Sequence, residues 1–532
     1  MPLSHQARCS SLAMIRSVLT VSSGNLASRL LGFGRDALTA ALLGAGPVAD
    51  AFLMAFQLIS VVRRMLAEGA LNAALVPAWM RLRETSGLAA ALAFAGNVLA
   101  TVSATLIVVT VIASAAMPLL MRALAPGFAG SESMQLAITD LRLMLPYLAF
   151  AGPTAVIMGL LNARHRFAIP AFLPLLFNGA LVLVAVLLLS LQQEPHFAAL
   201  MMAATVGAAG LLQLVVLALL TRRHELATPL RISFASGMRD FAGKAVPGMV
   251  ANSGPQLLIV AGAILASTSP SAVSWLYFAN RLIELPLGMV GVAIGTVLVP
   301  EITRALTKGD RAAMVNAESR GIELAAALAL PAAIGLIVLS EPIVRVLFEH
   351  GAFTAADTRA TALTLGCLGF GLPAYVVIKA LSPAFFARGN TMTPLMATLK
   401  GIAVAMVLAL VLERPFGVAG IAVAVALGAW SSAVSLIRSI AATFGFSIDA
   451  EARRRLPRIG LAAFVMGGVL WLAVRLAGPV SGANGLLQAA TLAVLIAAGV
   501  AIYGLLLWML RVIDRNDIQG ALIRSRSGDL RA

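Results

Sequence analysis

Long apolar segments dominate this 532-residue chain and decide what it can fold into. Hydrophobic residues make up 60% of the sequence and charged residues only 12%. A helix that crosses a bilayer needs about 20 mostly apolar residues, and about fourteen segments meet this need. They begin near residues 17, 50, 88, 137, 170, 197, 245, 272, 320, 358, 393, 418, 459 and 485. Strand-like alternation is missing, so we predict an all-α polytopic membrane protein with about 14 transmembrane helices.

Basic residues gather in the loops that would face the cytoplasm. With a cytoplasmic N-terminus, these loops contain Arg81, Arg83 and the arginine-rich stretch 453–458. The outward loops contain five basic residues: Arg122, Arg345, Arg359, Arg414 and Arg475. This positive-inside bias predicts that both termini are cytoplasmic. The formal net charge of +16 then reflects topology, and nucleic acid is not an expected partner because no basic soluble domain is present.

Three short similarities recur at nearly the same spacing along the chain. PLLMRALAPGF at 118–128 resembles PIVRVLFEHGA at 342–352, an offset of 224 residues. ARHRFAIP at 163–170 matches ARGNTMTP at 387–394 at Ala, Arg and Pro, with the same offset. ALVPAWMR resembles VLVPEITR 223 residues later. The offset spans six predicted helices, an even number, so both copies have the same orientation.

The repeat predicts two parallel-repeat six-helix lobes plus two C-terminal helices. We expect an N-terminal lobe over 12–222 and a C-terminal lobe over 239–445. The appended helices cover 457–511, and a cytoplasmic tail covers 512–532. Repeat architectures of this kind place the substrate site between the halves, near the membrane midplane.

Charged residues inside the apolar segments indicate the site. The first two segments contain Arg29, Arg35, Asp36, Asp50, Arg63, Arg64 and Glu68. An ionised side chain at the bilayer centre costs roughly 2.5–3.5 kcal/mol on insertion scales, so it usually faces a wet cavity or a partner. Arginine stays charged, and its planar donor fork suits phosphate. The cluster therefore predicts an anionic ligand held within the membrane.

Other motifs point away from catalysis. Cys9 and Cys367 lie far apart without metal-ligand spacing, so neither a disulfide nor a metal site is predicted. No Walker loop, nucleophile elbow or zinc motif is present. We therefore predict a transporter without a cofactor, and its energy source is left open among an ion gradient, the membrane potential and consumption of the product.

Several motifs together resemble the MurJ (MviN) lipid II flippase family. The resemblance covers about residues 17–445. It rests on SRLLGFGRDALTA, APGF, LPYLAFAGPTAVIMGLLNARHRFAIPAFLPLLFN, FANRLIELPLGMVGVAIGTVLVP and VIKALSPAFFARGNTMTP. It implies the fold of the multidrug/oligosaccharidyl-lipid/polysaccharide exporter superfamily and a location in the cytoplasmic (inner) membrane. It also implies translocation of lipid II, an undecaprenyl-diphosphate-linked disaccharide-peptide, to the outer leaflet. Membrane lipids and the cell-wall synthesis machinery are the other implied partners.

The resemblance carries the family's functional arginines onto named positions. They are Arg29 and Arg35 in the first predicted helix, Arg63 in the second and Arg281 in the eighth. The family's acidic residue after the first loop corresponds to Asp50. The family usually has Pro-Asn where this chain has Ile59 and Ser60, and some relatives have Asp where this chain has Asn280. Without the proline, the second helix should be straighter unless Ser60 bends it. A stretch at 245–267 without acidic residues gives no basis for the sodium site of some relatives.

The expected roles of the cations follow from their positions. Arg29, Arg63 and Arg281 are expected to hold the diphosphate, with a structural salt bridge as the alternative for each. Arg35 lies about 9 Å outward from Arg29 and is expected to hand the head group on. Lys379 is expected to be a further cation of the substrate cavity, and the alternative is that its side chain extends to the membrane surface.

The remaining charged residues are expected to support the site or to gate it. Arg64 is about 100° around the helix from Arg63 and should pair with Glu68 at i+4. Asp36 and Asp50 lie near the outer ends of the first two helices, where they either form an outer gate or cap the helices. Glu284, one turn after Arg281, is expected to orient that arginine.

Rival functions remain open from the residues alone. An exporter of another polyprenyl-linked glycan would use the same cations, because contacts to a diphosphate do not read the sugar. An exporter of cationic drugs should have an acidic, aromatic cavity, which this pattern does not favour. A non-transporting membrane scaffold would tolerate loss of the arginines.

Overall fold

The computed structural model consists of helices joined by short turns and loops in the residues that it describes, with no strand among them. These are residues 3–512 apart from 68–69, 165, 223–229, 233–237, 240, 244, 247–248, 250–252, 294–310, 387, 389, 445–448 and 477–484. The chain divides into two compact units, of which the first ends at Ser253 and the second begins at Gly254. The extents of the two predicted lobes stay a prediction.

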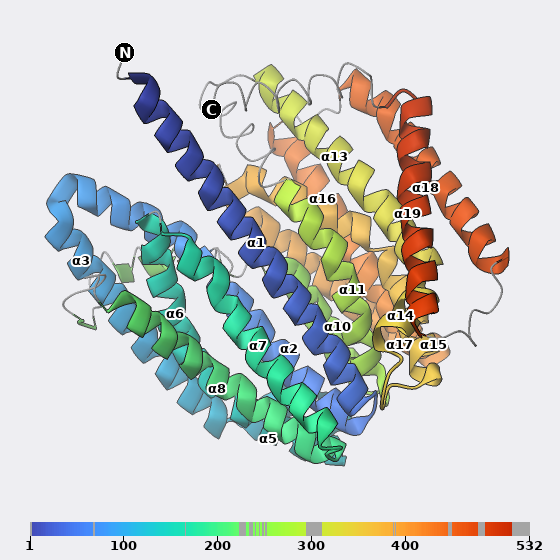
Figure 1. Ribbon diagram of the computed structural model, residues 1–532, viewed down its shortest axis with the longest axis horizontal. Helices are drawn as coiled ribbons and strands as arrows, with labels where there is room; N and C mark the ends of the chain where they lie inside the picture. The colour runs from blue at the N-terminus through green and yellow to red at the C-terminus, as the bar shows by residue number, and fades with distance from the viewer. Residues whose placement is uncertain are drawn as a thin grey trace. The chain divides into compact units, whose positions relative to one another are not determined.

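The first unit is a bundle of long helices that pack in pairs (Figure 1). Its elements are α1 (Leu3–Leu43), α2 (Pro47–Ala67), α3 (Ala70–Ala115), α4 (Met117–Leu124), the 3₁₀ turn η1 (Pro126–Phe128), α5 (Glu132–Met144), α6 (Pro146–Ala163), α7 (Ala168–Ser190) and α8 (Pro195–Thr221). Helix α1 packs on α7, α3 on α6 and α2 on α5, while α8 contacts both α6 and α7. Proline in the first turns of α4, α6 and α8 suits a helix start, because its missing N–H would have no partner there.

The second unit is built in the same way from helix pairs. Its elements are α10 (Gly254–Ala266), α11 (Ala272–Ala293), α13 (Arg311–Val338), α14 (Ser340–Phe348), α15 (Ala355–Gly369), α16 (Leu372–Phe386), α17 (Met392–Phe444), α18 (Ala450–Leu476) and α19 (Gly485–Met509). Helix α10 packs on α17, α16 on α17, and α11 on α15 and α16. Phe278 of α11 packs against Phe348 and Phe353, with ring centroids 5.0 and 5.5 Å apart, in the buried core of this unit.

Many of the helices are suited to cross a membrane. In the described part of the chain, eight helices are long and apolar enough, or up to nine when α15 and α16, which meet at 45°, count as one span. Helix α17 has 53 residues and is broken at Gly417, where φ is 55°. At 1.5 Å per residue it would measure about 80 Å, more than twice the hydrocarbon thickness, so its halves are long enough for two spans. Gly87, with φ 84°, breaks α3 in the same way.

These observations confirm the predicted all-α polytopic class. The breaks at Gly87 and Gly417 lie where the sequence predicted new helices, near 88 and 418. Left-handed φ values are easily reached only by glycine, so each break has a local cause. The total of 14 helices stays a prediction, since the count covers only the described residues.

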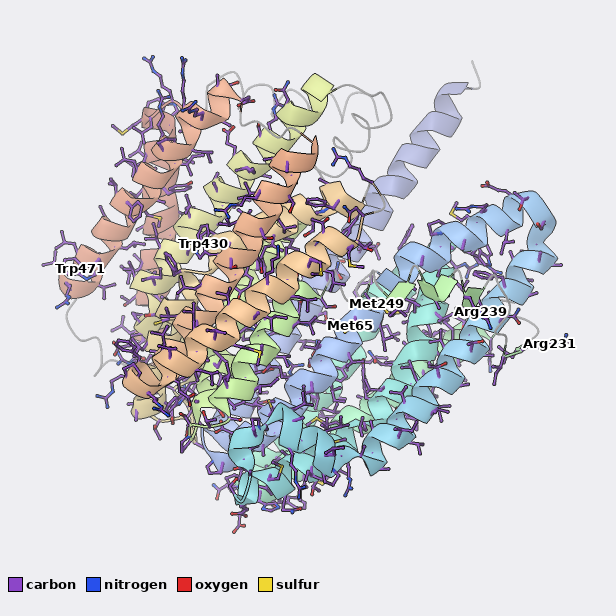
Figure 2. The ribbon with its side chains drawn as sticks, turned by 180° about the vertical axis from the view of Figure 1, so that it is seen from behind. Met65, Arg231, Arg239, Met249, Trp430 and Trp471 are labelled. Atoms are coloured by element: carbon purple, nitrogen blue, oxygen red, sulfur yellow. The ribbon has the colours of Figure 1, made fainter. Side chains whose placement is uncertain are left out.

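The two C-terminal helices are seated on α13 within the second unit. Helices α18 and α19 lie side by side (Figure 1), and α18 packs on α13. Arg455 of α18 donates to Glu323 of α13 at 3.2 Å, and the Tyr503 hydroxyl of α19 donates to the Ala327 carbonyl at 2.8 Å. The opposite face of α18 remains exposed, including Trp471, which is labelled in Figure 2.

Candidate functional site

Arg35 of α1 is buried in the first unit and fully engaged by its neighbours. Its Nε and Nη2 donate to Asp36 Oδ1 at 2.9 and 2.5 Å, and its Nη1 donates to Asn178 Oδ1 of α7 at 3.0 Å. Asn178 Nδ2 in turn donates to the Ser28 carbonyl at 3.1 Å. The guanidinium carbon lies 4.6 Å from the ring centroid of Phe56 on α2. Arg35 therefore joins α1 to α7, and its donors point into the bundle of this unit.

A row of aromatic rings lies between α2 and α7 and contacts two of the predicted arginines. Phe52 stacks on Phe56 at 5.9 Å between centroids, and Phe56 stacks on Phe177 at 6.4 Å. The guanidinium carbon of Arg63, which is half-buried on α2, lies 5.2 Å from the Phe177 centroid. Cation–π contact of this kind helps to hold the Arg63 guanidinium in place beside the ring. Arg35 and Arg63 are thus both in contact with this row.

Arg29 differs from Arg35 although both are on α1. Arg29 is exposed, whereas Arg35 is only 5% exposed. The two residues are six positions apart, which rotates the second by about 240° around the helix. One side chain therefore faces away from the packed side of α1 while the other enters it.

Asp50, Ser60 and Arg64, three of the other residues predicted for the first unit, are on α2. Asp50 is buried in the first turn of that helix, where its charge interacts favourably with the helix dipole. Ser60 and Arg64 are half-buried, and α2 continues as one helix from Pro47 to Ala67. Glu68 lies outside the described residues, so its pairing with Arg64 stays a prediction.

In the second unit, Arg281 is held by a residue of its own helix. Arg281 Nη1 donates to Glu284 Oε2 at 2.9 Å, and the two side chains are 18% and 22% exposed. Asn280 Nδ2 lies 3.5 Å from the other carboxylate oxygen of Glu284. Lys379, the middle residue of α16, is exposed, and α16 packs against α11. Both cations predicted for this unit therefore lie within apolar helices.

Two partners of these charges escaped the sequence analysis. Asn178 was missed although it is the only amide in the apolar segment 168–190, which is the signal that points to it. The aromatic row was missed as well, although Phe52 and Phe56 are spaced i,i+4. Across the described residues, no three His, Cys, Asp or Glu side chains gather as metal ligands would. The arrangement offers cations, which suit an anionic ligand.

Solved transporter structures share this fold. A structure of lipid II flippase MurJ in an inward closed conformation is 22% identical in sequence, with a TM-score of 0.75, and covers 92% of this chain and 98% of that one. A multidrug resistance MATE family transporter of the MOP superfamily, in an inward-facing conformation, is 16% identical with a TM-score of 0.65, covering 81% and 95%. The fold therefore defines the class of the protein as a polytopic α-helical membrane protein.

Sequence comparison identifies the family within that class. The family described as lipid II flippase MurJ matches residues 39–483. A probable lipid II flippase MurJ of Rhizobium tropici is 35% identical over 520 residues, which are 97% of this chain and 98% of the relative. The lipid II flippase MurJ of Burkholderia cenocepacia is 30% identical over 505 residues, with coverage of 93% and 97%. The chain belongs to the MurJ family, which confirms the resemblance seen in its motifs.

Proposed function

We propose that this protein is a flippase that moves lipid II from the inner to the outer leaflet of the cytoplasmic (inner) membrane. The observation that carries the proposal is the presence of exposed cations, Arg29 and Lys379, on helices that are otherwise apolar. A lipid diphosphate must bring its charged head group through about 30 Å of hydrocarbon. Charge-assisted bonds from these cations would replace the water that the phosphates lose.

The contacts described above divide the work among the basic residues. We assign the diphosphate to Arg29, Arg63, Arg281 and Lys379, which are exposed or half-buried. Arg35 was expected to hand the head group on, but its bonds to Asp36 and Asn178 favour a positioning role. For Arg35 to bind phosphate, it would have to leave two partners in a buried environment, which is costly.

Transport would proceed by alternating access with both termini in the cytoplasm. A ligand shifts such an equilibrium only by its differential affinity for the two states. Arg281 would gain a phosphate oxygen in addition to Glu284, or in its place, when it binds the substrate, which gives the loaded and empty forms different ion pairs. Asp50 and Asp36 would act near the outer side, and contacts with the cell-wall synthesis machinery are a further expectation.

The proposal is tested by depletion and complementation. Depleting the protein should stop lipid II from becoming accessible at the outer face of the membrane, and the wild-type chain should restore accessibility. Arg29→Ala should insert normally, because removing an exposed intramembrane charge eases insertion, yet it should fail to restore transport. Normal complementation by a well-expressed Arg29→Ala protein would contradict the assigned role of Arg29. Unchanged lipid II accessibility after depletion would contradict the function itself.

A further inference from the structure

The end of the Lys379 side chain lies directly against Gly291 of α11. A Cβ atom added at Gly291 would lie 2.5 Å from both Cε and Nζ of Lys379, and 3.2 Å from its Cδ. Real Cβ atoms do not approach other atoms this closely, because packed atoms repel below van der Waals contact. Only glycine at 291 therefore leaves room for the ammonium group in its present place.

Gly291 lies on nearly the same face of α11 as Glu284, the partner of Arg281. Gly291 is seven residues after Glu284, which rotates it by only about 20° around the helix. It lies about 10 Å along the axis from Glu284 and about 15 Å from Arg281. Two cations thus lie in series along α11: Arg281, paired with Glu284, and the ammonium of Lys379 of α16, about 15 Å further along the axis.

The setting of Lys379 requires an aqueous or polar surrounding. It is exposed at the middle of α16, between the buried residues Ile378 and Ala380. An ionised lysine within an apolar span faces water or a partner, because contact with hydrocarbon is too costly. In the predicted topology α11 runs from the outside inward, so Gly291 lies nearer the cytoplasm than Arg281.

We propose that Gly291 is a positioning residue that seats the Lys379 ammonium on this face of α11. The inference rests on the proposed function and adds the order in which two of the cations meet the diphosphate. The ammonium of Lys379, a residue of α16, is the cation that a diphosphate entering from the cytoplasmic side meets first along α11, and Arg281 is the second. Arg281 binds later because it lies about 15 Å farther from the cytoplasmic side than Gly291 in the predicted topology. The pair forms a two-step cationic path along a single helix.

The test uses the substitution Gly291→Ala in the full chain. The added methyl group would meet only the flexible end of a lysine side chain, so it should displace the ammonium without disturbing the helices. Gly335→Ala on α13 is the matched control, because an added Cβ there meets nothing within 4 Å. Lys379→Gln removes the charge, and Lys379→Arg keeps it.

Binding of undecaprenyl diphosphate to the purified protein in lipid nanodiscs is the readout. Lys379→Gln should weaken the affinity about tenfold or more, as loss of a charge-assisted bond does. Gly291→Ala should weaken it by roughly three- to tenfold, on the same basis. The double variant should bind no more weakly than Lys379→Gln alone, because residues that act through one another are non-additive. Lys379→Arg should recover part of the affinity, and Gly335→Ala should match the wild type.

The outcomes separate this inference from the proposed function. Wild-type affinity in both Gly291→Ala and Lys379→Gln would overturn the inference, as would fully additive losses in the double variant. If Arg29→Ala and Arg281→Gln still abolish lipid II transport in that case, the proposed function stands without the two-step path. Normal transport by Gly291→Ala, Lys379→Gln, Arg29→Ala and Arg281→Gln would overturn the inference and the assignment of these cations to the diphosphate. Unchanged lipid II accessibility after depletion of the protein would overturn the proposed function.

Discussion

Arg35 in the first unit and Arg281 in the second are both arginines within apolar helices, but their partners come from different parts of the chain. Arg35 is bonded to Asp36 and to Asn178, a residue 143 positions away on α7. Arg281 is bonded to Glu284, three positions away on its own helix. The exposed fractions of the side chains differ in the same direction, at 6% and 18%.

The difference separates an arginine that holds helices together from one that can change partners. Leaving a buried pair costs several kcal/mol, because the abandoned partner stays in a low-dielectric environment. A pair at i,i+3 on a half-exposed helix face is worth only about 0.2–0.5 kcal/mol. A phosphate oxygen can therefore replace Glu284 at Arg281 far more easily than it can replace the partners of Arg35.

The largest effect is expected from Arg35→Ala. The change leaves the Asp36 carboxylate and the Asn178 amide without their shared donor, which should destabilise the first unit by about 3–5 kcal/mol. Thermal unfolding of the purified protein should show the loss, and transport should fall with it. Arg29→Ala, on the same helix but exposed, is the control and should unfold like the wild type. Equal unfolding temperatures for the wild type, Arg35→Ala and Arg29→Ala would show that Arg35 does not hold its helices together. That result would contradict the contrast drawn between Arg35 and Arg281.

Arg281→Gln should act on transport and leave stability nearly unchanged. Its local ion pair contributes little to folding, but loss of a charged ligand should reduce lipid II flipping tenfold or more. Flipping in proteoliposomes and thermal unfolding should be measured on the same preparation. A variant that unfolds early while its flipping rate per folded molecule stays normal would show that Arg281 is structural.

Asn178→Ala sharpens the comparison within the first unit. It removes the acceptor for Arg35 Nη1 and the donor to Ser28, so we expect a loss of about 1–3 kcal/mol. Denaturant unfolding followed by the fluorescence of the chain measures the loss. Asn178→Asp is the informative companion, because a second carboxylate facing Arg35 should restore part of the stability that alanine loses. A neutral Asn178→Ala would mean that the α1–α7 bond is dispensable.

Glu284→Gln should have the smallest effect on stability. Only the Arg281–Glu284 pair is weakened, so the free energy of unfolding should change by no more than about 0.5 kcal/mol. Substrate binding is the more sensitive measurement, because the Arg281 guanidinium would no longer share its donors with a carboxylate. Affinity for undecaprenyl diphosphate should rise by a few-fold, and a marked fall would show that Glu284 orients Arg281 toward the substrate.

The local part of this protein was readable from its sequence. Apolar runs of spanning length predicted a polytopic helical membrane protein, because the hydrophobicity of a segment depends on its own residues. Glycines at 87 and 417 interrupt helices where new segments were predicted, since a left-handed φ is a property of one residue. The motifs also identified the MurJ family, which the comparisons confirm.

The partners of the charges were decided by the tertiary structure alone. Which of Arg29 and Arg35 is buried depends on how α1 is rotated against α7, and a shift of a few residues along a helix reverses the answer. Asn178 reaches Arg35, and Lys379 reaches Gly291, across helices that are distant in sequence. Such contacts carry no local pattern, because they arise only when apolar surfaces pack and bring particular polar groups together. Composition thus determined that this chain lies in a membrane, and packing determined which of its cations are held by neighbouring helices.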